Sequence, residues 1–217
     1  MRRALATIAD PFTVVRHRGS LRHTLSDDVF AFGWRHAIEP LRRHKDAGKV
    51  TSMPISIQVD DPLNGDVKAL INAHLDFARS QTPLCHVFAL PAESLAAEKI
   101  EFYSCRDDGV LVGIGALREI GDRHFEIKSM HTAQFARGRG VARTMLGHLI
   151  EVAHQRGAHR VSLETGTSPG FHPARSLYAA SGFEVCEPFG DYSATPDNVC
   201  MTLALSSRTA RSSSTLQ

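Results

Sequence analysis

The sequence lacks most of the features that mark membrane, disulfide and metal proteins. None of its apolar runs approaches the roughly 20 residues that a membrane-spanning helix needs. Its 12 histidines include no His-x-x-x-His or His-Glu-x-x-His pair, which are the spacings that zinc sites use. Its four cysteines, Cys85, Cys105, Cys186 and Cys200, include no Cys-x-x-Cys pair. This favours a reduced compartment, with all four as small buried side chains. We therefore predict a cytoplasmic protein with no membrane segment and no metal.

The usual nucleotide-binding fingerprints are also missing. Gly138 and Gly140 are followed by Arg143, where the dinucleotide fold needs a third glycine for helix packing. No Gly-Lys-Ser/Thr sequence follows them, so the phosphate loop of ATP-binding proteins is absent as well. Chemistry on NAD or ATP is thereby disfavoured.

Charge is unevenly distributed along the 217 residues. Residues 1–52 carry 10 Lys and Arg against five Asp and Glu, whereas residues 53–217 carry 15 against 18. We predict a basic, poorly ordered extension at 1–52, one domain at 53–205 beginning at Met53, and a disordered Ser-rich and Thr-rich tail at 206–217. The extension could instead be an accessory helix, or a targeting or nucleic-acid-binding arm.

A strand, a glycine-rich loop and a helix follow one another in the second half of the chain. Residues 123–132 alternate as a strand, with Phe125, Ile127, Ser129 and His131 expected on one face. Apolar residues at helical spacing then run from Val141 to a C-terminal glycine at position 157, and residues 160–164 read as a second buried strand. The right-handed crossover rule makes this a βαβ unit with parallel strands.

The loop between the first strand and the helix has the properties of a pyrophosphate site. A helix start carries unpaired N–H groups and a partial positive charge. Gly138 and Gly140 have no Cβ atoms to keep a phosphate from the backbone, and Ala142 permits close helix packing. Arg137 and Arg139 add positive charge. The sequence therefore predicts a bound nucleotide diphosphate at this loop.

Two motifs resemble the GCN5-related N-acetyltransferases (GNAT superfamily). The acyl-CoA signature of that family, Arg/Gln-x-x-Gly-x-Gly/Ala, is matched by Arg137, Gly140 and Ala142. The stretch Ala174–Tyr178 followed by Gly182-Phe183 is similar to the family's Ala-x-x-Leu-Tyr-x-x-x-Gly-Phe helix. The two motifs occur in the expected order, with a strand between them.

One residue departs from the family pattern. Many relatives carry Asn three residues before the alanine of the second motif, where this chain has Phe171. A side-chain contact that this Asn often makes near the cofactor is therefore not expected here.

The resemblance implies an α/β fold with a mixed, mostly antiparallel central sheet and helices on both faces. The fourth and fifth strands are expected to splay apart at the acyl-CoA site. The residues agree with this order, because strands at 55–59, 101–106 and 110–118 precede the βαβ unit, and a helix at 67–78 follows the first strand. A turn at residues 107–109 joins the second and third strands.

The resemblance also implies residues for binding acetyl-CoA. The pantetheine arm is expected along the strand edge at Ser129, Met130 and His131. The pyrophosphate is expected on the loop and helix start, at Arg137, Gly138, Arg139, Gly140, Val141 and Ala142.

Catalysis needs a base for the amine and, for the departing thiolate, an acid. Tyr178 lies at the position where relatives place a tyrosine, and its phenol donates a proton at neutral pH. Glu126 is the first candidate base and Glu164 the second, because each lies on a strand expected to flank the acceptor, and a partly buried carboxylate has a raised pKa. The alternative for Glu126 is an ion pair with a nearby lysine such as Lys128. His131, His172 or a chain of water molecules are the alternatives.

The predicted function is direct transfer of an acetyl group from acetyl-CoA to a primary amine of a small molecule or peptide, in a ternary complex. The alternatives are a sensor that binds acyl-CoA without turnover, and an RNA-associated protein that uses Arg137, Arg139 and the basic extension. We expect a monomer or homodimer, with no nucleic-acid or membrane partner. No cluster of residues identifies the acceptor.

Overall fold

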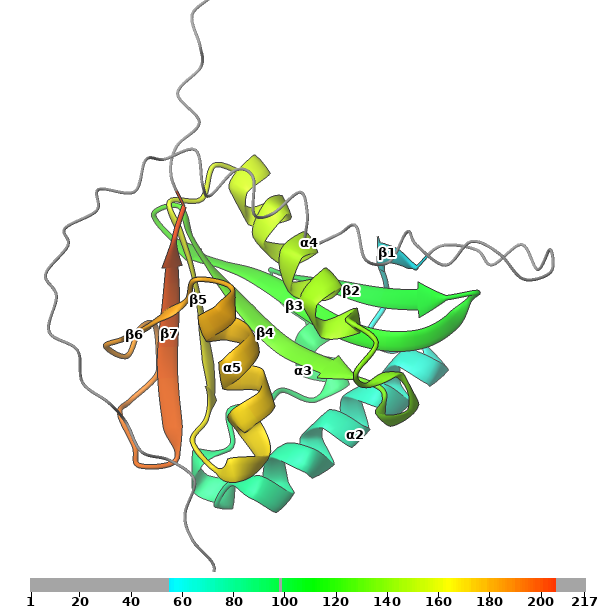
Figure 1. Ribbon diagram of the computed structural model, residues 1–217, viewed down its shortest axis with the longest axis horizontal. Helices are drawn as coiled ribbons and strands as arrows, with labels where there is room; N and C mark the ends of the chain where they lie inside the picture. Colours follow the sequence, from blue (N-terminus) through cyan, green and yellow to red (C-terminus); the bar gives the residue numbers. More distant parts are fainter. Residues whose placement is uncertain (1–54, 98, 206–217) are drawn as a thin grey trace, which may run out of the picture. The chain divides into compact units, whose positions relative to one another are not determined.

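The computed structural model describes residues 55–97 and 99–205. The predictions for 1–52, for the boundary at Met53 and for 206–217 lie outside the described residues. Seven strands form one sheet in the order β1-β2-β3-β4-β5-β7-β6 (Figure 1). All neighbouring strands are antiparallel except β4 and β5, which are parallel. This is the predicted mixed, mostly antiparallel sheet.

The element boundaries agree with the sequence pattern over most of the domain. The strands are β1 (Ser56–Val59), β2 (Ile100–Asp107), β3 (Val110–Gly121), β4 (His124–Thr132), β5 (Arg160–Gly166), β6 (Glu184–Cys186) and β7 (Asn198–Ala204). The helices are α2 (Gly65–Gln81), α3 (Ala92–Ala97), α4 (Val141–Gln155) and α5 (His172–Ala180), with 3-10 turns η2 (Leu84–His86), η3 (Gln134–Ala136) and η4 (Pro169–Phe171). The short helix α3 and the 3-10 turns were not predicted, because they are too short to show a period.

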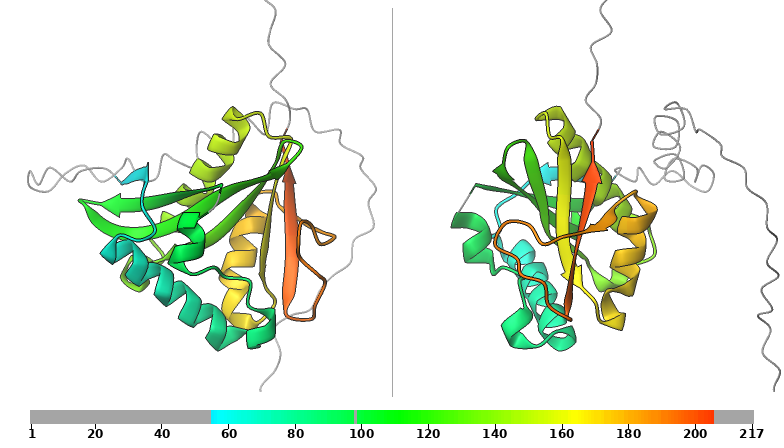
Figure 2. Two further views of the ribbon diagram at one scale, coloured as in Figure 1. Left: turned by 180° about the vertical axis from the view of Figure 1, so that it is seen from behind. Right: turned by 90° about the vertical axis from the view of Figure 1, so that its left-hand side faces the viewer.

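Helices cover both faces of the sheet, as predicted (Figure 2). On one face the apolar sides of α4 and α5 pack on strand residues such as Phe125 and Ile127. On the other face α2 and α3 pack on residues such as Phe102 and Ile114. Among the described residues, no helix has the length and apolar character to cross a membrane.

Two glycines let α4 approach β3 closely. A Cβ atom on Gly113 would lie 2.8 Å from the Val141 Cγ1, and one on Gly115 would lie 3.0 Å from the Leu149 Cδ1. Side chains at these strand positions would therefore push the helix outward. The first residue of α4, Val141, is 2% exposed, so its side chain belongs to the core.

A bulge in β4 overturns the predicted alternation of that strand. Lys128 pairs with Ala116, but His131 pairs with Ile114, so one extra residue of β4 is fitted between these pairs. Ser129 has a φ of 53°, a left-handed conformation that non-glycine residues adopt only when the surrounding structure requires it. The prediction that His131 shares a face with Phe125 was wrong, because an extra residue reverses the faces beyond it.

The environment of His131 shows this reversal. Its ring lies 5.3 Å from that of His74 and 6.1 Å from that of Phe77, both on α2. Phe125, in contrast, belongs to the core under α4. The bulge thus turns the end of β4 toward α2.

The four cysteines are free, but only two of them are buried. Cys105 and Cys200 are buried, whereas Cys85 is exposed and Cys186 partly exposed. The prediction of four buried cysteines was therefore wrong for Cys85, on the 3-10 turn η2, and for Cys186, on the edge strand β6, because both elements lie at the surface. Among the described residues, no three His, Cys, Asp or Glu side chains are grouped so that they could hold a metal ion.

Candidate active site

The parallel strands β4 and β5 part halfway along their length. Their pairing runs from His124 with Arg160 to Ile127 with Leu163. Both strands continue beyond this last pair, to Thr132 and Gly166, so the facing backbone groups there are no longer bonded to each other. Such groups need partners, which an extended chain rich in amides can supply. This is the predicted splay of the fourth and fifth strands.

The bulged segment of β4 lies on one side of this opening. Ser129, Met130 and His131 are each partly exposed, and the buried Oγ of Ser129 has no hydrogen-bond partner among the described residues. His131 is neutral at physiological pH, because burial and the nearby Arg137 charge lower its pKa to about 4. The opening therefore offers unpaired polar groups without a charge on its histidine.

The loop after β4 leaves the start of α4 open to an anion. Gly138 and Gly140 have φ values of 76° and 84°, and a Cβ atom on either would meet nothing within 4 Å. Gly140 is the N-cap of α4 and supplies no side-chain cap, and the first turn of the helix contains no acidic residue. The partial positive charge of the helix start is thus neither capped nor neutralised by a side chain of that turn.

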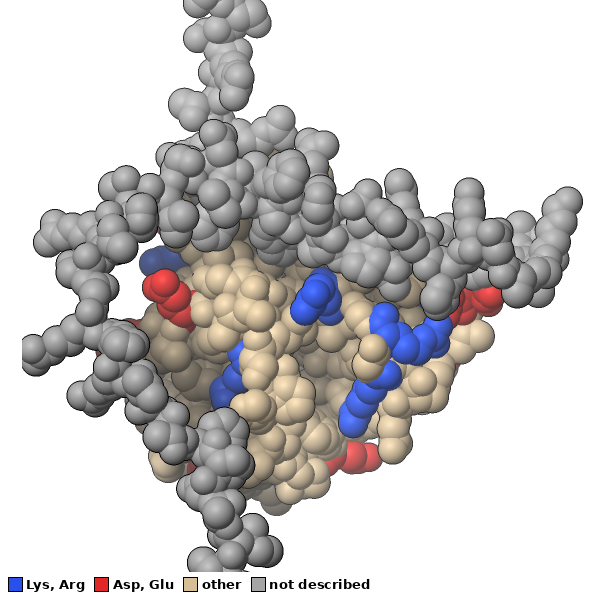
Figure 3. Space-filling view, viewed as in Figure 1, with Lys and Arg blue, Asp and Glu red and all other residues tan. Residues whose placement is uncertain are grey.

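Exposed arginines surround this helix start. Arg137, Arg139 and Arg143 are all exposed, and Figure 3 shows basic side chains gathered in the region where α4 begins in Figure 1. Arg139 is held by Asp107 at the tip of the β2–β3 hairpin, with 2.5 Å between Nη2 and Oδ2. Part of the Arg139 charge is therefore already compensated.

Tyr178 projects from α5 into the apolar core. It is 8% exposed and its ring lies 6.0 Å from that of Phe183. Burial, with a smaller contribution from the charge of Glu164, raises the pKa of Tyr178 to about 12. Its hydroxyl is therefore protonated at neutral pH and lies within electrostatic range of Glu164.

Glu126 is the centre of a buried ionic network. Its carboxylate has no exposed surface, and it is bound by Arg118 through Nη2 at 2.9 Å and by Lys128 through Nζ at 2.8 Å. Tyr192, from the β6–β7 loop, donates its hydroxyl to the same carboxylate at 2.5 Å and accepts from Lys128 at 2.5 Å. Two cations and a phenol thus already occupy the oxygens of the first candidate base.

Glu164, the second candidate base, has a different environment. It is partly exposed and forms no ion pair within 4.0 Å in the part of the chain that the structure describes. Burial raises the pKa of Glu164 to about 7; the Lys128 charge opposes this rise and the Glu126 charge adds to it. A carboxylate with this pKa can accept and release a proton near neutrality.

The raised pKa of Glu164 predicts a pH-dependent effect on stability. Its folded-state pKa of about 7 lies above the ordinary value of 4.5, so its ionisation between these pH values destabilises the folded protein. Glu164→Gln should therefore raise the melting temperature relative to wild type at pH 8, and not at pH 4. The gap between the two pKa values corresponds to roughly 3 kcal/mol. The expected difference is therefore on the order of 10 °C, since about 1 kcal/mol shifts Tm by about 2–4 °C in a domain of this size.

Thermal melts at the two pH values test this prediction. The control is Glu184→Gln, which changes an exposed carboxylate on β6. It should shift Tm equally at both pH values. A Glu164→Gln shift that is the same at pH 4 and pH 8 would contradict the stated environment of Glu164.

The sequence did not place Arg118 and Tyr192 in this network. Arg118 is the direct partner of Glu126 across β3 and β4. Predicting the register of this hairpin from the sequence would have placed the two side chains beside each other. The position of Tyr192 depends on a long loop and had no local signal. The contacts that hold this loop include the Tyr192 ring, 5.1 Å from that of Phe88, and His86 Nδ1, 2.7 Å from Asp197 Oδ2.

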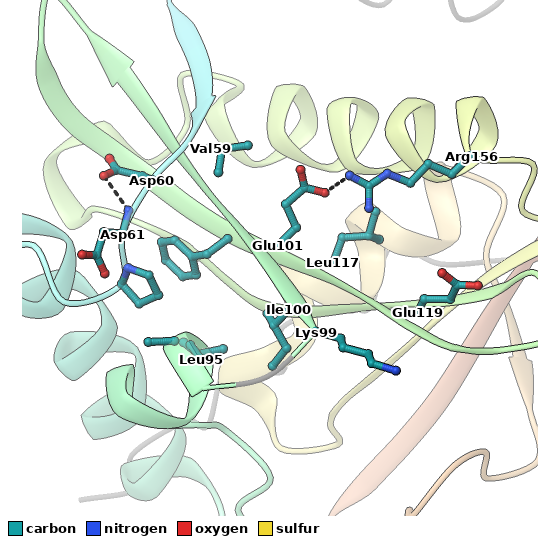
Figure 4. A pocket seen from close by; sticks show the side chains of 13 residues that line it. Val59, Asp60, Asp61, Leu95, Lys99, Ile100, Glu101, Leu117, Glu119 and Arg156 are labelled. Atoms are coloured by element: carbon teal, nitrogen blue, oxygen red, sulfur yellow. Dashed lines mark hydrogen bonds and ion pairs between the residues drawn. The ribbon is translucent and has the colours of Figure 1, made fainter.

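A pocket of about 500 Å³ lies away from these residues (Figure 4). Its lining includes Asp60, Leu95, Leu117 and the ion pair of Glu101 with Arg156. Arg156 directly follows α4, whereas the glycine-rich loop at residues 137–140 precedes that helix. The pocket is therefore at the opposite end of α4 and separate from the opening between β4 and β5.

The fold and the site define a class of enzyme that transfers acyl groups from acyl-CoA. A family model described as the acetyltransferase (GNAT) family matches residues 67–183. The uncharacterized N-acetyltransferase YsnE of Bacillus subtilis (strain 168) is 44% identical over 149 residues, which cover 69% of this chain and 99% of YsnE. The uncharacterized N-acetyltransferase YedL of Escherichia coli (strain K12) is 40% identical over 150 residues, covering 69% of this chain and 94% of YedL.

A solved structure shows the same fold. A protein from Klebsiella pneumoniae described as an acyl-CoA N-acyltransferase is 28% identical and superposes with a TM-score of 0.57, covering 70% of this chain and 97% of that protein. The chain belongs to the GNAT family of N-acetyltransferases, whose members use acyl-CoA.

Proposed function

We propose that this protein transfers an acetyl group from acetyl-CoA to a primary amine of a small molecule or peptide, directly and in a ternary complex. One observation carries this proposal. Lys128 and Glu164 are the first residues beyond the last pair of β4 and β5, so a carboxyl group that titrates near pH 7 stands where the opening begins. The location in the cytoplasm and the monomeric or homodimeric state stay predictions.

The chain supplies two surfaces that fit acetyl-CoA. The unpaired edge at Ser129–His131 can bond the amides of the pantetheine arm, and the orphaned Ser129 Oγ supports a polar partner there. The open backbone at residues 137–142 can bind the pyrophosphate through its N–H groups. Val141 can contribute its backbone amide but not its side chain, because the side chain is buried. The bound thioester supplies the activated acyl group.

The protein's own groups then move two protons. We assign Glu164 as the base that accepts the proton of the acceptor amine, in preference to Glu126, because Arg118 and Lys128 occupy the Glu126 carboxylate. His131, with its pKa lowered to about 4, is a weaker base at neutral pH, and His172 is exposed at the start of α5. We assign Tyr178 as the acid for the departing sulfur, because its hydroxyl is protonated.

The alternative is a protein that binds acyl-CoA without turnover. Both functions predict stabilisation by CoA, but only the enzyme releases free thiol from acetyl-CoA when an amine is added. A thiol-release assay with a panel of primary amines therefore separates the two functions. CoA binding without thiol release for any amine would favour the sensor.

The assignment of the pyrophosphate loop predicts the effect of Gly140→Val. Saturating CoA, at about 100 times its Kd, should stabilise the wild type by about 2.7 kcal/mol. In the variant this stabilisation should disappear, because a β-branched side chain disfavours the left-handed backbone at a φ of 84° and fills the open phosphate space. Thermal melts with and without CoA measure the difference.

Gly121→Val is the matched control for backbone strain. Gly121 also has a positive φ, 118°, with nothing within 4 Å of a Cβ atom, but it lies at the β3–β4 turn. This variant should melt lower than wild type and still gain the full CoA shift. A full CoA shift in Gly140→Val would show that the loop is not the phosphate site.

A further inference from the structure

The side chains at the start of the opening form one charged group on a single face of the sheet. Glu126 of β4 pairs with Ser162 of β5, and paired residues share a face. Lys128 and Glu164 each lie two positions further along their strands, so they share that face too. The contact of Lys128 with Tyr192 shows that this is the face toward the β6–β7 loop.

Among the described residues this group contains two cations and two carboxyls. Arg118 and Lys128 are positive, and Glu126 binds both of them. Glu164 is the fourth member, within electrostatic range of Lys128 and Glu126. When Glu164 is ionised and ready to accept a proton, the group is neutral. After it accepts the proton, the group carries one net positive charge.

The cation nearest the opening keeps a hydrogen-bond donor for a ligand. The ammonium of Lys128 has three N–H donors. In the part of the chain that the structure describes, it donates to Glu126 Oε1 at 2.8 Å and to the Tyr192 hydroxyl at 2.5 Å. One donor is left, on a side chain that is 10% exposed. An anionic oxygen at this position would meet a cation that is largely shielded from water.

We propose that the acceptor is an amino acid, whose carboxylate is bound by Lys128 while its amine faces Glu164. This inference rests on the proposed function and names its substrate class. A plain ammonium adds one positive charge to the neutral group, and that charge stays there throughout the reaction. A zwitterionic amino acid adds none, so the total charge is zero both before and after Glu164 takes the proton. In a partly buried site the neutral arrangement costs less desolvation energy.

The reaction balances with this acceptor. The ammonium gives one proton to Glu164, and the freed nitrogen lone pair forms the N–C bond to the acyl carbon. The C–S bond breaks, and the sulfur takes a proton from Tyr178. The nitrogen's remaining extra proton and the proton held by Glu164 both leave to solvent, which also reprotonates Tyr178. The carboxylate is unchanged and remains bound to Lys128 in the N-acetylated product.

Pairs of acceptors that differ only in the carboxylate test the proposal. Free amino acids are compared with their carboxamides, with acetyl-CoA as donor and thiol release as readout. Wild-type kcat/KM should be at least about tenfold higher for the acids, as expected for a hydrogen bond between charged groups. Amidation lowers the pKa of the amine, so a larger fraction of it is unprotonated at neutral pH, and a preference for the acid cannot come from a larger supply of free amine.

Variants at Lys128 locate the preference. Lys128→Met should raise KM for the acids about tenfold and leave KM for the amides within about twofold. Lys128→Arg keeps the charge and should keep the preference. Lys99→Met is the control, since Lys99 is exposed and lines the distant pocket, and should change neither value.

The wild-type comparison keeps the test decisive even if Lys128→Met does not fold. Equal kcat/KM for acids and amides, or a preference for amides, would overturn this inference while leaving the acetyltransferase function standing. An acid preference that Lys128→Met retains would also overturn it. Thiol release with neither class, despite CoA binding, would instead count against the proposed function.

Discussion

The Tyr178→Phe enzyme is expected to turn over about 100-fold more slowly than the wild type while binding CoA with nearly unchanged affinity. The phenol is buried, with its pKa raised to about 12, so at neutral pH it can donate a proton to a departing thiolate. Phenylalanine keeps the ring that packs near Phe183 and removes only the hydroxyl. Steady-state kcat with a reactive amine and the thermal shift with CoA measure the two effects.

Tyr103→Phe is the matched control for this prediction. Tyr103 is also buried, at 4% exposed, and belongs to the same apolar core. Burial and Glu101 raise its pKa as well, but it lies on β2, outside the opening between β4 and β5. Its variant should retain wild-type turnover. An unchanged kcat in Tyr178→Phe would assign Tyr178 to packing alone.

Glu164→Gln should lower kcat by about 100-fold to 1,000-fold, because an amide cannot accept the amine's proton. The wild type should also lose activity below about pH 7, where Glu164 becomes protonated. The variant should lack this acidic limb, since its residual reaction depends on water. The profile of kcat/KM against pH, measured with one acceptor between pH 5 and pH 9, tests both statements.

Glu126→Gln separates the two candidate bases. Glu126 binds Arg118 and Lys128, so its variant should melt at a lower temperature. It should keep the acidic limb, moved toward lower pH because the Glu126 charge contributes to the raised pKa of Glu164. The assignments would have to be exchanged if Glu126→Gln removed this limb and Glu164→Gln retained it. A limb that survives in both variants would favour a chain of water molecules as the base.

The secondary-structure elements and the glycine-rich loop were predicted correctly where a few neighbouring residues determine them. The period of α4, the two parallel strands around it and the hairpin at residues 107–109 follow from the spacing of apolar residues and from turn chemistry. The glycine-rich loop was recognised because Gly138 and Gly140 stand at a helix start. Each of these features depends on a few neighbouring residues, so the pattern of the chain was sufficient.

The bulge at Ser129 shows where the local pattern failed. Alternation alone predicted His131 on the face of Phe125, and an extra residue in the strand reversed this. A bulge is fixed by the partner strand and by the packing on both faces, not by the residues of one strand. The tertiary structure around Ser129 therefore decided which way the end of β4 faces.

The sequence by itself determined the fold family and the position of the glycine-rich loop at the start of α4, because helix periods and glycine conformations are properties of short segments. Only the tertiary structure decided how the carboxyls differ. The β3–β4 register places Arg118 beside Glu126, and the parting of β4 and β5 leaves Glu164 without an ion pair among the described residues. Both glutamates have the same side chain, so their chemistry is set by the charges and the burial that distant segments bring to them.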